Sequence, residues 1–310
     1  MKHSARVVRF LSVVALLACA GLSQAGALDL QKIEDGVYAV IGPLGNRSPE
    51  NLGNNATFGF VVTDEGVVLI DPGGSYKGAA QLHALIQSVT DQPVKLVINT
   101  GGQDHRWLGN GYFAQRGARI IANERAVADQ RARVGDQLFM LVTLLGEQGL
   151  DGTEPVYADQ TFDQSTSLSF GGVRFELHYS GHAHTPGDSF VWLPQRKILF
   201  TGDIVYVQRM LGVIDVSSSA TWLGVLPILS ALGPRILVPG HGAVTSIEEA
   251  RADTFEYLAF LRERVAQYMD AGGGIEGVGK LDQSRFSYLQ NYDSLKGRNA
   301  QRVYEELEWE

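Results

Sequence analysis

Short apolar runs, each ended by glycine, proline, asparagine or aspartate, recur along most of the chain. They predict strands at 37–41, 57–62, 67–70, 96–98, 117–122, 166–170, 173–179, 189–193, 197–200 and 236–238. Helical spacing replaces this pattern at 76–89, where Leu82, Leu85, Ile86 and Val89 share one face, and again at 222–232 and behind Ser246. Strands that alternate with helices in this way predict an α/β fold.

The N-terminus follows neither pattern. Lys2, Arg6 and Arg9 precede an uncharged run over 10–22, and small residues follow at 25–27. This order is typical of a secretory signal peptide, so we expect 1–25 to be removed and the protein to be periplasmic. The run is shorter than the roughly 20 residues that span a membrane. Cys19, the only cysteine in the chain, leaves a lipoprotein anchor as the alternative.

The net charge of the chain argues against some classes of binding partner. The formal net charge of −8 would become −11 on cleavage, because the first 25 residues hold three basic and no acidic side chains. An acidic protein of this kind is not expected to bind nucleic acid or an anionic membrane surface. Cleavage would also remove the single cysteine, leaving neither a disulfide nor a thiolate metal ligand.

Acidic and imidazole side chains follow four of the predicted strands, as Asp104-His105, His184, Asp203 and His241. Each has glycine close by, as a ligand loop with tight turns requires. Sheets of α/β proteins place their chemistry at the carboxyl ends of strands. One such histidine alone is more often structural, but four positions together predict a metal site.

The phrases around these residues resemble the metallo-β-lactamase superfamily. They are Asn-Thr…Gly-Asn at 99–110, His-Thr-Pro-Gly-Asp at 184–188, Phe-Thr-Gly-Asp at 200–203 and Pro-Gly-His-Gly at 239–242. The resemblance covers about 36–246 and implies a four-layer αββα sandwich, within a domain that we place at 26–285. We expect the remaining tail, 286–310, to pack on this domain or to be mobile.

The loop at 99–110 departs from the family pattern Asn-Thr-His-x-His-x-Asp-His-x-x-Gly-Asn. Gly101 and Gln103 stand where the first two histidines belong. Without a gap, His105 and Arg106 take the places of the Asp and the last His; with one residue deleted, Asp104 and His105 match instead. We prefer the deletion, because a guanidinium keeps its proton and cannot ligate a metal.

The resemblance therefore implies one intact metal site and one that has lost two ligands. The intact site would use Asp104, His105, Asp203 and His241, so we expect one tightly bound zinc ion. His184 belongs to the degraded site and is then available as a general base. The expected catalytic residues are His184 and the metal ligand Asp104. Further roles around the metal or the substrate are expected for Asp71, Gln103, Arg106 and Tyr206, and a weaker ligand candidate is His182.

The segment 123–151 lies between the first and second ligand loops and is helical in composition. It carries no expected ligand, but it contains an apolar cluster at 138–145. We expect an inserted helix that stands apart from the metal scaffold, either packed on the core or acting as a lid over the substrate cleft.

The leading hypothesis is a periplasmic zinc hydrolase of a small-molecule ester, thioester or amide. The overall pattern is similar to the exported quinoprotein-relay, sulfur-oxidation-like branch of these hydrolases, which implies a link to periplasmic quinoprotein dehydrogenases. An alternative is a non-catalytic binding or relay component that retains a remnant metal site. Iron oxygenase chemistry, as in the persulfide dioxygenase branch, is least favoured, because it needs the degraded site.

Overall fold

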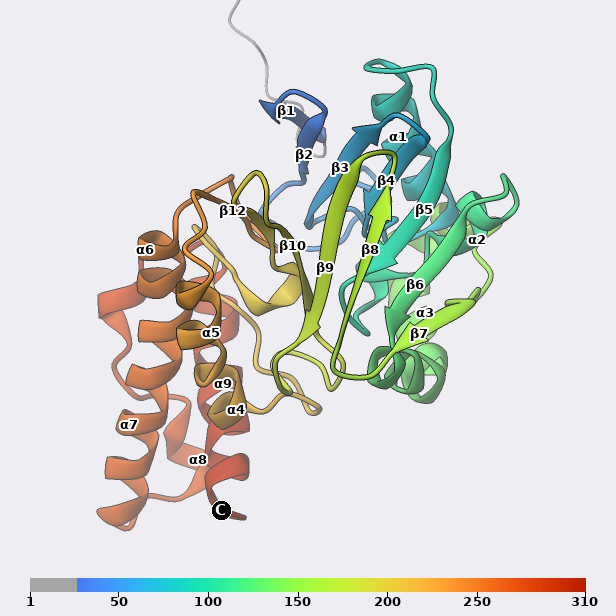
Figure 1. Cartoon of the computed structure of the whole chain (residues 1–310). Coiled ribbons are helices and arrows are strands. Elements are labelled where there is room, and N and C mark those ends of the chain that lie inside the picture. The colour runs from blue at the N-terminus through green and yellow to red at the C-terminus, as the bar shows by residue number, and fades with distance from the viewer. Residues whose placement is uncertain (1–26) are drawn as a thin grey trace, which may run out of the picture.

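The computed structural model describes residues 27–310, which form two β-sheets with helices on their outer faces (Figure 1). The first sheet has seven strands in the order β1 (Asp29–Glu34), β2 (Val37–Ile41), β3 (Thr57–Thr63), β4 (Gly66–Ile70), β5 (Val94–Asn99), β6 (Arg119–Asn123) and β7 (Gln160–Phe162). The second has five, in the order β12 (Ile236–Val238), β11 (Ile198–Phe200), β10 (Ser189–Leu193), β9 (Val173–Tyr179) and β8 (Ser165–Phe170). The predicted signal peptide and Cys19 lie outside the described residues.

Helices cover the outer face of each sheet. Those against the first sheet are α1 (Tyr76–Gln87) and α2 (Asn110–Ala114). The larger group in orange and red in Figure 1, against the second sheet, comprises α4 (Ser219–Leu223), α5 (Val225–Ala231), α6 (Ile247–Ala250), α7 (Glu256–Asp270), α8 (Ile275–Val278) and α9 (Tyr292–Leu307). The long α3 (Glu124–Leu150) packs on the loop that follows β5.

The core lies between the two sheets. Val68 and Ile98 of the first sheet belong to the same buried cluster as Leu177 and Val191 of the second. Strands β4 and β10 are buried along their whole length, which explains why their sequences are mostly apolar and do not alternate with polar residues. The architecture is the expected four-layer αββα sandwich.

The C-terminal segment completes the helical layer on the second sheet. Ala300 and Val303 of α9 are fully buried in the cluster that also contains Trp222 and Leu258. Of the two expectations for the tail, the structure has the packed one. Within residues 27–310, no helix combines the length and apolar character that crossing a membrane would require.

Candidate metal centre

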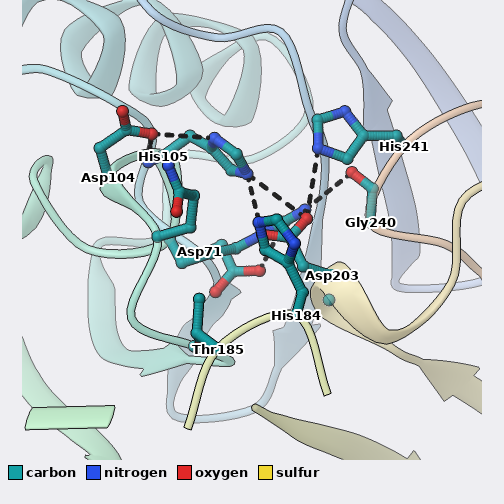
Figure 2. Close-up of polar contacts among 12 residues, drawn as sticks. Asp71, Asp104, His105, His184, Thr185, Asp203, Gly240 and His241 are labelled. Atoms are coloured by element: carbon teal, nitrogen blue, oxygen red, sulfur yellow. Dashed lines mark hydrogen bonds and ion pairs between the residues drawn. The ribbon is translucent and has the colours of Figure 1, made fainter. Parts of the chain in front are cut away.

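Three loops bring potential metal ligands into one buried cluster. His105 lies in the 3-10 helix η1 (Asp104–Arg106) after β5, Asp203 in η2 (Gly202–Ile204) after β11, and His241 just after β12. One ligand atom from each lies within 4.8 Å of the others. Figure 2 shows the imidazoles of His105, His184 and His241 converging around the Asp203 carboxylate.

The spacing of these atoms suits a single metal ion. His105 Nε2 lies 3.1 Å from Asp203 Oδ2, and His241 Nε2 lies 3.2 Å from Asp203 Oδ1. Ligands that bind zinc tetrahedrally at about 2.0–2.1 Å are roughly 3.3 Å apart. The donor atoms are therefore already close to the separation that one ion would impose.

Each of the three imidazoles has an oxygen acceptor beside its Nδ1. His105 Nδ1 lies 3.0 Å from Asp104 Oδ1, His184 Nδ1 lies 2.9 Å from the Gly212 carbonyl, and His241 Nδ1 lies 2.9 Å from the carbonyl of Asn55. When Nδ1–H donates to these oxygens, Nε2 carries no proton and has a free lone pair. Hydrogen bonds of this kind orient metal-binding histidines. In His105 and His241 that lone pair would then face a carboxylate oxygen, and a cation between them would satisfy both.

Two arginines lie beside the Nδ1 atoms of His105 and His241 and would stabilise these imidazoles without a metal. Arg47 Nη2 lies 2.9 Å from His105 Nδ1, and Arg209 Nη1 lies 3.0 Å from His241 Nδ1. If the guanidinium donates to Nδ1, the ring carries its proton on Nε2 and donates it to Asp203. The cluster is thus compatible with one metal ion or, in the other tautomer, with hydrogen bonds alone.

Arg106 is fully buried beneath the cluster and holds two carboxylates. Its Nη1 donates to Asp71 Oδ2 at 2.9 Å and its Nη2 donates to Asp203 Oδ1 at 2.7 Å. The carbonyls of Thr57 and Gly240 accept its remaining bonds, at 3.0 and 2.8 Å. Of the two roles expected for Arg106, around the metal or on the substrate, its contacts correspond to the first, because the guanidinium does not line the pocket.

This contact also corrects the preferred alignment of the loop. His105 and Arg106 are the residues that reach Asp203, as the ungapped alignment requires, whereas the deletion assigned that role to Asp104 and His105. The guanidinium stands against the carboxylates of Asp71 and Asp203, so a second metal ion on this side would meet a fixed positive charge.

Asp104 does not join the ligand cluster. Its Oδ1 accepts hydrogen bonds from Arg47 Nε at 2.9 Å and Nη2 at 2.5 Å, and it also lies beside His105 Nδ1. Burial alone would raise the pKa of Asp104, but the charge of Arg47 and the contact with His105 hold it below its ordinary value. Asp104 is therefore a fixed anion that orients His105, which corrects its expected role as a ligand.

The space that a histidine at position 101 would need is filled, because a Cβ on Gly101 would lie 2.5 Å from Asp188 Oδ1. The neighbouring Gly102 is equally confined, since a Cβ there would lie 1.9 Å from Asp129 Oδ2. Asp188 is itself held by Thr185, whose backbone N–H donates to it at 2.7 Å. The loss of the first site is thus built into the packing of the loop, not only into its sequence.

Helix α3 supports this loop directly. Gln130 Nε2 donates to the Gly101 carbonyl at 3.1 Å, Gln137 Nε2 donates to the Gly102 carbonyl at 2.8 Å, and Trp107 Nε1 donates to Gln137 at 3.0 Å. The predicted helix over 123–151 is present, but the expectation that it stands apart from the scaffold is wrong. The buried glutamines Gln130 and Gln137 were the missed signal, because a buried amide must find hydrogen-bond partners.

The remaining predicted residues divide between the pocket and its supports. Gln103 and Tyr206 line the pocket, and the Tyr206 ring stacks on His241 with centroids 4.5 Å apart. Burial and the nearby Asp203 raise the pKa of Tyr206 well above its ordinary value, so the phenol keeps its proton. Asp71 braces the loop by accepting the Thr100 N–H at 2.7 Å. His182 faces away, toward the Val216 carbonyl.

A cavity of about 300 Å³ opens over His105, His184 and His241. A family model described as the metallo-beta-lactamase superfamily matches residues 53–241, which include every residue of the cluster. The chain belongs to the metallo-β-lactamase superfamily. The structure adds that, in this member, a buried arginine stands at a family ligand position.

The chain is similar at low identity to two curated relatives. The chain is 27% identical over 172 residues to metallo-beta-lactamase type 2 of Bacteroides fragilis, a match that covers 53% of this chain and 60% of the relative. It is 25% identical over 228 residues to the 2,4-dinitroanisole O-demethylase subunit alpha of Nocardioides sp. (strain JS1661), covering 73% of this chain and 63% of the relative. The chain thus spans about three fifths of the length of each.

Among solved structures, the stereoselective inverting sec-alkylsulfatase of a Pseudomonas species is similar over 90% of this chain and 50% of that one, with a TM-score of 0.69. The sequences are 19% identical, so this likeness shows the fold alone. The metallo-beta-lactamase from Pontibacter korlensis has a TM-score of 0.59 at 24% identity, over 75% of this chain and 99% of that one.

Proposed function

We propose that the protein is a hydrolase that uses one zinc ion held by His105, Asp203 and His241 to cleave an ester, thioester or amide. The observation that carries this proposal is the convergence of two Nε2 atoms on one buried carboxylate at 3.1 and 3.2 Å. Two imidazoles and one carboxylate form the type of ligand set that leaves a fourth zinc position open for catalysis. Zinc held in such a site would lower the pKa of a water molecule to about 7 and so supply hydroxide near neutral pH.

Two other residues of the pocket can act on the substrate. Burial lowers the pKa of His184 to about 4, so the ring is neutral at pH 7, and donation of Nδ1–H to Gly212 leaves its Nε2 free to accept a proton. Tyr206, which lines the same pocket and keeps its phenol proton, can donate a hydrogen bond to negative charge that develops on the substrate. Asp104 and Asn55 hold His105 and His241 in orientation.

The similarity to a metallo-beta-lactamase and to an O-demethylase subunit supports cleavage of a small molecule as the class of reaction. The ion is proposed as single because Arg106 and the filled space around Gly101 leave no second set of ligands. Zinc suits a mixed set of imidazole and carboxylate ligands.

Metal content and activity, measured together, test the proposal. We expect mass spectrometry to find one equivalent of zinc after dialysis against a weak chelator. Hydrolysis of chromogenic esters, thioesters or nitrocefin should be lost on stripping the metal and return on reloading. His241→Ala should lose both metal and hydrolysis, and His182→Ala should lose neither. Two tightly held equivalents, or hydrolysis that survives full metal removal, would overturn it.

The second candidate is a non-catalytic binding or relay component, linked to a periplasmic quinoprotein dehydrogenase. The contacts of Arg47 and Arg209 with the Nδ1 atoms of His105 and His241 favour it, because they allow hydrogen bonds alone to hold the cluster together without a metal. Such a protein would take up no zinc at micromolar concentrations and hydrolyse none of these substrates. Export is part of both proposals, and N-terminal sequencing of the mature protein tests it.

A further inference from the structure

The cavity over the metal centre is lined by basic and neutral groups. Three arginines line it, Arg47, Arg209 and Arg298, and no aspartate or glutamate is among its lining residues. Arg47 already has a counter-ion, since it lies 2.5 Å from Asp104. The other two make no ion pair with any of residues 27–310, so the cavity presents two uncompensated positive charges.

Arg209 lies at the deep end of the cavity. Its side chain is 8% exposed, its Nε has no hydrogen-bond partner among the described residues, and its Nη1 contacts only His241 Nδ1, at 3.0 Å. A buried guanidinium without a carboxylate has lost its hydration and gained no opposite charge. An anion in the cavity would supply that charge.

Arg298 marks the outer rim. It extends from α9, is exposed to solvent and lines the same cavity as Arg209. A pair of guanidiniums lining one cavity, one buried and one exposed, suits a group with several acceptor oxygens, because each arginine presents a fork of N–H donors. The cavity therefore has the chemistry of an oxyanion site.

Apolar side chains of α3 also line the cavity and continue outside it, where Asp136 and Thr143 join them. Met140 and Leu144 of α3 face the cavity and also line an adjoining groove of about 360 Å³, which includes Phe139. Phe139 is 79% exposed and Met140 48% exposed, so this surface has no protein cover among the described residues. Ile214 and Leu295 extend the apolar lining on the far side of the cavity.

We propose that the substrate of this site is an amphiphile with one oxyanion group and an apolar chain. The oxyanion, a carboxylate or a sulfate, pairs with Arg209 and Arg298, and the chain lies on Met140 and Leu144 and leaves along the groove beside Phe139. Substrate identity rests on the proposed hydrolase function, but binding of such an amphiphile does not. The groove is thus the continuation of the site and takes part of the substrate.

Calorimetric titration of the purified full chain, as isolated and again after chelation, tests the binding. The probes are octanoate, octyl sulfate, butanoate, octanol and octyltrimethylammonium, all below their micelle concentrations. We expect octanoate or octyl sulfate to bind at least about tenfold more tightly than octanol, as one charge-assisted contact provides. Butanoate should be weaker by about fourfold for each methylene that the groove buries. The ratio of octanoate to octyl sulfate separates a planar from a tetrahedral oxyanion.

Two pairs of variants assign the binding to the two walls. Arg298→Gln should weaken octanoate about tenfold and leave octanol unchanged; Arg302→Gln, one turn further along α9 and outside this cavity, should change neither. Met140→Ser should reduce the preference for the eight-carbon chain about fourfold. Val142→Ser, exposed on α3 but outside both the cavity and the groove, should not.

Equal binding of octanol and octanoate, tighter binding of the cation, or unchanged affinity in Arg298→Gln would overturn the inference. These outcomes are independent of turnover. A protein that binds octanoate but takes up no metal would refute the hydrolase and keep the site. A zinc-dependent hydrolase that binds none of these amphiphiles would refute the proposed substrate site and keep the hydrolase function.

Discussion

The candidate metal centre has two halves that are held in different ways. One half matches the family phrases, and the other, the loop after β5, departs from them and is called the rebuilt half below. Asp203 and His241 sit at the ends of β11 and β12, where family phrases are intact and the Asn55 carbonyl accepts from the imidazole. The loop after β5 instead depends on side chains: Arg106 beneath it, Asp188 against Gly101 and Asp129 against Gly102. A ligand site can therefore be lost by packing, with charged and polar groups filling the space of imidazoles.

The strongest test of this difference removes the cation of the rebuilt half. Arg106→Met leaves Asp71 and Asp203 buried without their shared counter-ion, and we expect the free energy of unfolding to fall by about 3–5 kcal/mol. Urea denaturation measures it. Arg174→Met, which breaks an ion pair of 2.9 Å at the surface, should cost at most about 1 kcal/mol. Equal losses would mean that burial does not distinguish the two pairs.

The second test concerns a carboxyl group in the rebuilt half. Burial and the charge of Asp203 raise the pKa of Asp188 to about 8, above the ordinary value of 3.8. The folded state thus keeps a proton that the unfolded state releases, so stability falls as pH rises from about 4 towards 8.

Asp188→Asn should remove this dependence. Relative to the wild type, we expect the variant's free energy of unfolding to rise by about 2.6 kcal/mol from pH 5 to pH 7, since one proton is worth about 1.4 kcal/mol per pH unit. Denaturation midpoints at pH 5, 6 and 7 provide the measurement. A difference that is constant with pH would show that Asp188 is ionised in the folded protein.

The third test asks whether Asp104 supports a ligand or is one. In the structure it orients His105, so Asp104→Asn should weaken zinc binding about 10- to 100-fold without abolishing it. Competition with a zinc-binding dye gives the affinity. His182→Ala, whose ring faces Val216, is the matched control and should have no effect. Complete loss of zinc in Asp104→Asn would restore Asp104 as a direct ligand.

The smallest effects come from two glycines. Gly102→Ala would place a methyl group 1.9 Å from Asp129 Oδ2 and should cost about 1–2 kcal/mol, without restoring a second metal. Gly135→Ala, in α3 with no atom within 4 Å of its Cβ, should stabilise the protein by about 0.5–1 kcal/mol. Thermal unfolding compares them. Stabilisation by both would mean that the loop is looser than its packing indicates.

The sequence determined the fold and named all four converging residues, His105, His184, Asp203 and His241. The apolar runs located most of the strands, because a strand buried on both faces must be apolar throughout. The phrases around His184, Asp203 and His241 identified the ligand loops, because each combines a strand end, a glycine turn and a side chain able to bind metal. The departure at Gly101 and Gln103 was also visible in the sequence, as was the helix over 123–151.

Tertiary structure decided what replaced the missing ligands. Spacing alone could not choose between the two alignments of the loop, because Asp104, His105 and Arg106 are consecutive and the η1 turn sets which of them face Asp203. Likewise, no local pattern shows that α3 braces the loop through Gln130 and Gln137. These contacts join segments that are distant in the chain, and they follow from how buried charges and amides find partners once the layers have packed.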